Sequence, residues 1–346
     1  MNRFTTSLLN WYAANKRELP WRDINDPYLI WISEIILQQT RVAQGFDYFV
    51  RFVHRFPDVA SLAAASQDEV MTYWQGLGYY SRARNLHEAA RSMNGSFPRT
   101  YEKVRRLKGV GEYTAAAICS FAYNMPYAVV DGNVYRVLAR YFGIHTPIDT
   151  GEGKKQFAAL AAEMMDKTQP ATYNQAIMDF GALQCTPQLP DCTRCPLNES
   201  CAARYEKTIA QLPVKQHRTK TSNRYFNYLY VRDKEDTFIH KRTANDIWKN
   251  LFELPLIETP DKLSEEDFRK LPLLHSLASE TELSTLRLVC RGVKHVLSHR
   301  IIYANFYTLM LTEGSSSFSS YQRVSIGALK NYAVSRLTEA FLEKYL

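Results

Sequence analysis

Four of the chain's 6 cysteines lie close together, as Cys185, Cys192, Cys195 and Cys201, with the spacing C-x6-C-x2-C-x5-C. The first residues, MNRFTTSLLNWYAANKRELPW, contain no apolar run of signal-peptide length, and no later segment is apolar enough for a membrane span. We therefore expect a cytoplasmic protein, in which cysteines stay reduced and structural disulfides are rare. Four clustered thiols then indicate a metal site, and tetrathiolate sites accept zinc or an iron-sulfur cluster.

The stretch 104–133 combines paired glycines, a small apolar helix and one carboxylate. Gly109 and Gly111 follow the segment VRRLK and allow a tight turn between two helices, with exposed backbone N–H groups. The next helix is expected over 113–123, and the partial positive charge at its start suits the turn to binding a phosphate. Asp131 enters a glycine turn from an apolar run, which is typical of a helix N-cap and also compatible with catalysis.

A lone carboxylate, Glu34, interrupts the apolar helix expected over 28–39, YLIWISEIILQQ. Apolar residues one turn before and one turn after Glu34 place it on a mainly apolar stripe. Because burial disfavours the charged form, we expect a raised pKa, as required of a group that donates a proton near neutral pH. The alternative is a structural glutamate at the edge of a helix interface.

The segment GLGYYSRARN, residues 76–85, is rich in glycine, tyrosine and arginine. Its glycines allow the backbone to approach a ligand, its rings can stack or wedge, and its arginines can bind phosphates. Alternatively, it is a surface loop that begins a basic helix.

The chain is long enough for two domains, because it has 346 residues. Its net charge of +8 indicates a polyanionic partner such as nucleic acid. We predict an all-α domain over 1–206, a polar and basic linker over 207–222, and an α+β domain over 223–346 with a helix in the last twenty or so residues. The β-rich runs are RYFNYLYVRD, TFIHKR and LRLVCRGVKHVLSHRIIYANFYTLML. The first two are separated by Lys234 and Glu235, as in a hairpin. The predicted helices cover 1–20, 28–39, 41–56, 66–74, 113–123, 150–168 and 173–183.

Five segments match a known enzyme family in order: SEIILQQTRV, QGLGYYSRARN, LKGVGEYTAAAI, VVDGNVYRV and the cysteine run. They resemble the MutY-type adenine DNA glycosylases, relatives of endonuclease III, over nearly the whole chain. The resemblance implies a multidomain fold, with an all-α helix-hairpin-helix glycosylase domain and a 4Fe-4S cluster on the four cysteines, so iron-sulfur is favoured over zinc. The α+β domain resembles the Nudix-like domain that recognises 8-oxoguanine. It lacks the Nudix hydrolase box, so no such hydrolase activity is implied.

The resemblance also implies catalytic roles. Glu34 is the expected acid, Asp131 the carboxylate that stabilises the sugar cation, and Asn133 the residue that positions Asp131. Superfamily members that also cleave the strand carry a lysine where this chain has Tyr113, and some carry one at Tyr135. Tyr113 is therefore expected near the carboxylates of a monofunctional enzyme.

A second set of residues is expected to contact the DNA or the extruded base. Its members are Arg22, Gln39, Tyr79, Arg82, Gly109, Gly111, Ser298 and His299. Among them, Gln39 and Tyr79 match residues that wedge into the duplex, and Arg22 matches a pocket arginine. The family's lesion-recognition loop often has the sequence Phe-Ser-His, whereas here Leu297 replaces the phenylalanine and both polar groups remain.

Together these features predict a monomeric, nucleoid-associated enzyme that excises adenine opposite 8-oxoguanine or guanine in double-stranded DNA, with no membrane partner. One alternative is an endonuclease III-like lyase for oxidised pyrimidines, which would carry the missing lysine and would not need the second domain. Another is a non-catalytic DNA-binding module with a structural zinc, against which the apolar setting of Glu34 argues.

Overall fold

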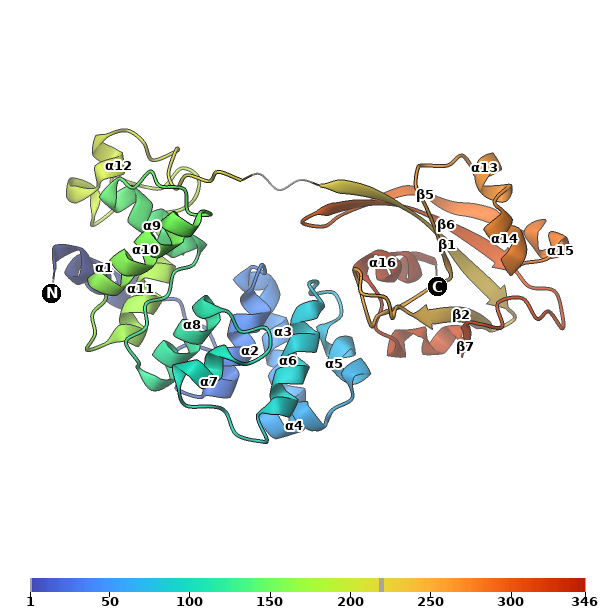
Figure 1. Ribbon diagram of the computed structural model, residues 1–346, viewed down its shortest axis with the longest axis horizontal. Coiled ribbons are helices and arrows are strands. Elements are labelled where there is room, and N and C mark those ends of the chain that lie inside the picture. Colours follow the sequence, from blue (N-terminus) through green and yellow to red (C-terminus); the bar gives the residue numbers. More distant parts are fainter. Residues whose placement is uncertain (1, 218–220, 346) are drawn as a thin grey trace. The chain divides into compact units, whose positions relative to one another are not determined.

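The computed structural model describes residues 2–217 and 221–345 (Figure 1). Packing divides them into two compact units. The helical unit contains residues 2–64 and 85–217, and the C-terminal unit contains residues 65–84 and 221–345. Among the described residues, none of the helices has the length and apolarity that a membrane span requires.

The N-terminal part of the chain is helical, as predicted. Its elements are α1 (Arg3–Asn15), α2 (Pro27–Leu37), α3 (Val42–Arg55), α4 (Val59–Ala64), α5 (Gln67–Trp74), α6 (Ser81–Ser92), α7 (Tyr101–Arg105), α8 (Glu112–Tyr123), α9 (Gly132–Phe142), α10 (Gly151–Met164), α11 (Pro170–Leu183), the 3-10 turn η1 (Asn198–Ser200) and α12 (Ala202–Tyr205). The first helix is shorter than the predicted 1–20. It ends at Asn15 because the backbone N–H and the side chain of Arg17 bind Asp179.

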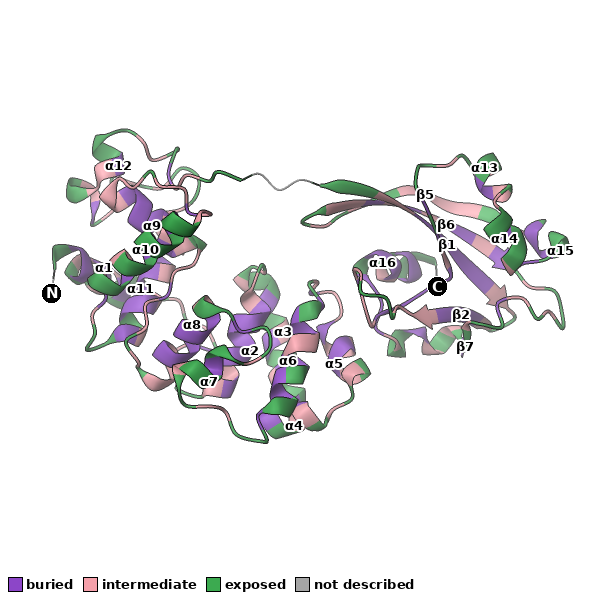
Figure 2. Cartoon of the chain, viewed as in Figure 1, coloured by how far each residue is buried: buried purple, intermediate pink, exposed green. Residues whose placement is uncertain are grey.

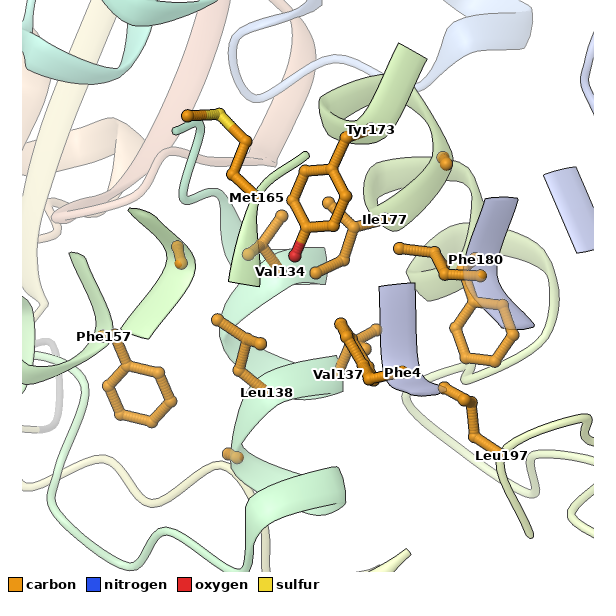
Figure 3. Close-up of a cluster of buried hydrophobic side chains, with 14 of the residues drawn as sticks. Phe4, Val134, Val137, Leu138, Phe157, Met165, Tyr173, Ile177, Phe180 and Leu197 are labelled. Carbon is orange, nitrogen blue, oxygen red and sulfur yellow. The ribbon is translucent and has the colours of Figure 1, made fainter. Parts of the chain in front are cut away.

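Apolar contacts hold α9 against α1 and α11 (Figure 3). The buried side chains that meet there include Phe4 of α1, Val134, Val137 and Leu138 of α9, and Tyr173, Ile177 and Phe180 of α11. Each is at most 3% exposed, so the helices cannot slide without exposing apolar surface. This packing fixes the start of α9, where Asp131 lies.

Helix α2 is buried along most of its length (Figure 2). It begins at Pro27, and the Asp26 side chain caps it by accepting from the N–H groups of Tyr28 and Leu29. Glu34 is 8% exposed within this apolar helix. The carboxyl group is therefore removed from bulk water, as its sequence context predicts.

The C-terminal unit is built on a mixed sheet (Figure 1). Its strands are β1 (Ser222–Asp233), β2 (Asp236–Lys241), β3 (Phe252–Glu253), β4 (Leu256–Thr259), β5 (Arg287–Val296), β6 (Arg300–Met310) and β7 (Gln322–Ser325). The helical elements after β4 are α13 (Glu265–Arg269), α14 (Pro272–Leu277), α15 (Glu280–Leu283), the 3-10 helix η2 (Ile326–Asn331) and α16 (Arg336–Tyr345).

The strands run in the order β3-β2-β1-β6-β5, with β4 also paired to β1 and β7 to β2. The central pair, β1 and β6, is parallel, from Ser222 opposite Arg300 to Arg232 opposite Met310. The β1–β2 hairpin turns at Lys234, which has a φ of 56°, and the predicted hairpin is confirmed. A second hairpin, β5–β6, turns over residues 297–299.

The predicted C-terminal helix is confirmed only over Arg336–Tyr345. Before it, the chain is extended, because Phe252 donates its N–H to the carbonyl oxygen of Ala333 at 2.8 Å and forms a parallel bridge with Val334. This pairing interrupts the helical segment and fastens it to β3.

The two compact units do not coincide with the predicted domains 1–206 and 223–346 and the predicted linker 207–222. Leu212, in the predicted linker, is 2% exposed in the core of the helical unit, and its carbonyl oxygen accepts from Arg140. Conversely, residues 65–84 group with the C-terminal unit, where Val334 N–H donates to Gln75 at 3.2 Å. Such long-range contacts leave no local sequence pattern. The predicted domain limits stay predictions.

Candidate active site

A cavity of about 740 Å³ opens in the helical unit beside α2, α8, α11 and the start of α9. The predicted site residues that line it are Arg22, Glu34, Gln39, Tyr113, Asp131 and Asn133. The fold thus gathers catalytic and base-contacting candidates that are spread over more than a hundred positions of sequence. Among the described residues, no lysine lines this cavity.

Glu34 carries the clearest electrostatic signature in the cavity. Burial raises its pKa to about 7, although a hydrogen bond with Tyr113 and the charge of Arg22 lower it, and the charge of Asp131 raises it. The predicted rise in the pKa of Glu34 is therefore confirmed. A substantial fraction of Glu34 is protonated at neutral pH, so it can act as a general acid.

Asp131 is both a helix cap and a cavity residue. Its Oδ1 accepts from the backbone N–H groups of Asn133 at 2.9 Å and Val134 at 2.8 Å, which is N-cap geometry for α9. Its Oδ2 accepts from Asn133 Nδ2 at 2.8 Å. Burial raises the pKa of Asp131, while these hydrogen bonds and the charge of Arg136 lower it. The two interpretations left open by the sequence are compatible, because the capping carboxylate also faces the cavity.

Asn133 is itself held by Arg136, one turn along α9. Arg136 Nη2 donates to Asn133 Oδ1 at 2.9 Å, and Arg136 Nε donates to the carbonyl oxygen of Cys185 at 2.7 Å. Gly181 makes room for this arrangement, since a Cβ there would lie 2.6 Å from Asn133 Cβ. A short chain of hydrogen bonds therefore connects Asp131 to the first residue of the cysteine run.

Sequence inspection missed two residues of α11 that belong to this region. Gln175 lines the cavity, and its Oε1 accepts from the Tyr12 hydroxyl at 2.9 Å. One turn later, the fully buried Asp179 accepts from Arg22 Nη2 at 3.1 Å. The available signal was a pair of polar residues four apart on a mostly apolar helix, which places both on one face.

The two predicted wedge residues share an uncommon backbone conformation. Gln39, at the cavity, has a φ of 58°, and Tyr79, in the C-terminal unit, has a φ of 47°. Residues other than glycine rarely occupy this left-handed region, which costs about 1–2 kcal/mol per residue. Nine other non-glycine residues in the described part of the chain also have a positive φ, so the conformation alone assigns no role, and both wedge assignments stay predictions.

The glycine hairpin lies before α8 and does not line the cavity. Gly109 has a φ of 78°, and a Cβ there would lie 2.8 Å from Asn85 Cβ, so only glycine fits without displacement. Gly111 is the N-cap of α8 and provides no side chain to bond the first N–H groups of that helix. Phosphate binding by this turn stays a prediction.

Four further predicted DNA-contact residues lie in the C-terminal unit. Ser298 and His299 are exposed in the turn between β5 and β6, residues 297–299, which we call the recognition turn after its predicted role. The Ser298 hydroxyl lies 2.6 Å from the Tyr79 hydroxyl, and the guanidinium carbon of Arg82 lies 5.3 Å from the Tyr79 ring centroid. The structure thus brings Tyr79, the predicted wedge residue, into contact with Ser298.

The four cysteines of the run surround one small hollow next to α9. The hollow is lined by Cys185, Cys192, Cys195 and Cys201, together with Arg140 and Arg204. Arg140 Nη1 lies 3.5 Å from Cys185 Sγ, so a cation stands beside the thiols. In the described part of the chain, no three His, Cys, Asp or Glu side chains are close enough to hold one metal ion.

Comparisons with known proteins found relatives of both parts of the chain. A family model for HhH-GPD superfamily base excision DNA repair proteins matches residues 32–163, and one for the NUDIX domain matches residues 227–344. The thermostable thymine-DNA glycosylase structure is 30% identical with a TM-score of 0.55, covering 59% of this chain and 95% of that one. Endonuclease III in a non-covalent DNA complex shares the fold. It is 22% identical with a TM-score of 0.52, covering 59% of this chain and 95% of that one.

Two relatives carry the same printed name, adenine DNA glycosylase. The protein of Buchnera aphidicola subsp. Baizongia pistaciae is 33% identical over 314 residues, which cover 87% of this chain and 84% of that protein. The Homo sapiens protein is 43% identical over 222 residues, which cover 60% of this chain and 41% of that protein. The predicted order of a helical glycosylase domain and a Nudix-like α+β domain is confirmed. The chain belongs to the adenine DNA glycosylase family.

Proposed function

We propose that this adenine DNA glycosylase hydrolyses the N-glycosidic bond of adenine opposite 8-oxoguanine or guanine in double-stranded DNA. Family membership supports excision of adenine. The observation that carries the chemistry is one cavity that holds Glu34, with a pKa of about 7, beside Asp131, which accepts three hydrogen bonds.

The substrate base must first leave the stack, because the atoms to be attacked are inaccessible inside a duplex. Extrusion costs a few kcal/mol of unstacking and unpairing. Gln39 and Tyr79, both held in the left-handed backbone region, are the proposed wedges that fill the gap. The extruded adenine then enters the cavity of the helical unit.

The two carboxyl groups of the cavity take different roles because their surroundings differ. Asp131 accepts hydrogen bonds from three N–H groups, which favour its ionised form against the effect of burial. Glu34 lies in the apolar α2 with a pKa of about 7, so it is the group that holds the proton. Burial raises the pKa of both groups, but at Asp131 three N–H donors oppose this rise, so we assign the proton to Glu34 and the negative charge to Asp131.

Protonated Glu34 donates its proton to a ring nitrogen of adenine, and the electron pair of the N-glycosidic bond leaves with the base. Positive charge develops on the sugar, and the Asp131 carboxylate stabilises it or captures it as a transient ester. Water then attacks the sugar, and its proton passes to the Glu34 carboxylate. Both carboxyl groups return to their starting states, as in retaining glycoside hydrolysis.

The same cavity supports a monofunctional enzyme. Strand cleavage by a lyase needs an amine that forms a Schiff base, and no lysine lines the cavity within the described ranges. Burial, with Glu34 and Asp131 nearby, raises the pKa of Tyr113 well above its ordinary value, so its hydroxyl is a poor nucleophile. Borohydride added during turnover should therefore trap no covalent protein–DNA adduct, and efficient trapping would overturn this part of the proposal.

The cysteine run is the proposed site of a 4Fe-4S cluster. Cys185, Cys192, Cys195 and Cys201 supply the thiolate ligands, and Arg140 supplies a compensating positive charge. When bound, the cluster supplies a structural clip that presents basic residues such as Arg194 to DNA. Purified protein should show thiolate-to-iron absorption at about 400 nm, whereas a colourless protein containing zinc would contradict the assignment.

One assay tests the proposed function. The protein is incubated with a duplex that carries a single adenine opposite 8-oxoguanine, and alkali then converts abasic sites into strand breaks. We expect a break at the adenine position only after alkali, together with free adenine detected by mass spectrometry. A break at an oxidised pyrimidine in a second duplex, without alkali, would favour the lyase alternative.

A further inference from the structure

One buried carboxylate near the cavity has no role in the chemistry described above. Asp179 of α11 is 0% exposed and does not line the cavity. Its Oδ1 accepts from Arg17 Nε at 3.0 Å, from Arg17 Nη2 and from Arg22 Nη2 at 3.1 Å. Its Oδ2 accepts from the Arg17 backbone N–H at 3.3 Å. One negative charge therefore holds two arginines, and both arginines line the cavity.

Arg22 is held in a position that its own hydrogen bonding does not favour. Its side chain is only 8% exposed, and its Nε has no hydrogen-bond partner within the described residues. A buried donor without an acceptor costs free energy, so another interaction must keep the guanidinium in place. The ion pair with Asp179 supplies that interaction, and Trp21, packed against Phe46 and Phe49, anchors the neighbouring backbone.

We infer that Asp179 is a positioning residue for catalysis, which acts by fixing the Arg22 guanidinium at the wall of the base-binding cavity. This inference rests on the proposed function. A fixed guanidinium can orient the extruded purine through its acceptor nitrogens, whereas a mobile one loses that orientation. Asp179 also neutralises one of the two positive charges that Arg17 and Arg22 bring to the cavity.

That neutralisation bears on the catalytic acid through Arg22, whose charge lowers the pKa of Glu34. The charged and titratable groups that act on Glu34 are Tyr113 from α8, Arg22 from the loop before α2, and Asp131 at the start of α9. Removing the Asp179 charge leaves a stronger positive potential near Glu34. A positive potential favours the carboxylate, so Glu34 would lose its proton at a lower pH.

The test is a double-mutant cycle with Asp179→Asn and Arg22→Met, measured by single-turnover adenine release from an 8-oxoguanine:adenine duplex. We expect Asp179→Asn to lower the rate constant by about ten- to a hundredfold, and to move the alkaline fall in rate to lower pH. In the Arg22→Met background, the same substitution should change the rate constant by no more than about twofold.

A control separates positioning from general destabilisation. Thr5 of α1 is buried, and its hydroxyl donates to the carbonyl oxygen of Met164 at 2.7 Å, away from the cavity. Thr5→Val removes a buried hydrogen bond. It should lower only the burst amplitude, which measures the fraction of folded enzyme, and leave the rate constant unchanged. If Asp179→Asn behaves like Thr5→Val, or slows both backgrounds equally, the inference is wrong. If the unsubstituted protein releases no adenine, the proposed function itself fails.

Discussion

The cavity carboxylates and the recognition turn differ in how firmly the fold holds them. Asp131 accepts three hydrogen bonds and caps α9, and Glu34 is 8% exposed within an apolar helix. Ser298 and His299, by contrast, are exposed at a hairpin tip. Proton transfer needs a shifted pKa and fixed geometry, which only burial provides, whereas base recognition needs polar groups that a partner can reach. We therefore expect substitutions in the cavity to act on rate, and substitutions in the turn to act on discrimination.

The largest effects should follow from Glu34→Gln and Asp131→Asn. Each removes a charge or a proton source with little change of volume, and asparagine remains a good N-cap for α9. We expect each to lower single-turnover base release by at least about 10³-fold, with duplex binding unchanged in a gel-shift titration. A near wild-type rate from either variant would contradict the assignment of Glu34 as the acid and Asp131 as the counter-charge.

A second effect of Glu34→Gln concerns stability. The Glu34 pKa rises from an ordinary 4.5 in the unfolded chain to about 7 in the fold. The folded state therefore binds the proton more tightly than the unfolded chain. The resulting contribution to the free energy of unfolding is fully present below about pH 4.5 and is lost as the pH rises through 7. Glutamine does not titrate, so the free energy of unfolding of Glu34→Gln, relative to that of the parent, should increase by up to about 3 kcal/mol between pH 4.5 and 8. Urea unfolding at both pH values measures this difference, and a pH-independent difference would contradict burial of the acid.

The recognition turn should produce a smaller and different effect. Ser298 and His299 can each donate or accept hydrogen bonds, and 8-oxoguanine differs from guanine by an N7 hydrogen and an 8-oxo group. Base-edge contacts contribute about 1–3 kcal/mol each. Ser298→Ala with His299→Ala should thus narrow the rate ratio between 8-oxoguanine:adenine and guanine:adenine duplexes by about one to two decades, while adenine release persists. Val296→Ala, at an exposed site beside the turn, is the matched control. Unchanged discrimination by the double variant would place lesion recognition elsewhere.

The smallest predicted effect is a gain. Leu297 occupies the position at which the family often has phenylalanine, and leucine offers packing without an aromatic face. Leu297→Phe should widen the same rate ratio by about two- to tenfold, because an aromatic contact adds a fraction of a kcal/mol to somewhat more than one. Leu297→Met, which keeps an aliphatic side chain, serves as the control, and an equal gain from both variants would exclude aromatic contact as the cause.

Much of the fold could be predicted because its signals are local. The β-rich runs on either side of Lys234 and Glu235 predicted the β1–β2 hairpin, and the helix predicted over 66–74 is confirmed as α5, which Ser66 caps. The early end of α1 and the grouping of residues 65–84 with the C-terminal unit could not be predicted. They depend on contacts such as Arg17 with Asp179, more than 150 residues apart, for which periodicity carries no information.

The site divides in the same way. The apolar neighbours of Glu34 predict its raised pKa directly from sequence. The spacing of Gln175 and Asp179 indicates only that they share a face of α11. That Gln175 reaches the cavity and Asp179 binds Arg22 depends on how α11 packs against the loop before α2. Residues that act through others are therefore the part of a site that sequence patterns describe least.

The central claim is that Glu34 delivers the proton that releases adenine, and its most direct test is the pH dependence of the single-turnover rate. With a pKa of about 7, the protonated fraction falls tenfold for each pH unit well above that value. We therefore predict that the rate constant for adenine release from an 8-oxoguanine:adenine duplex is nearly constant in mildly acidic buffer and falls at higher pH, with a midpoint near pH 7. The same unsubstituted protein and the same duplex are used at every pH. A rate that stays flat or rises between pH 6 and pH 9 would contradict the claim.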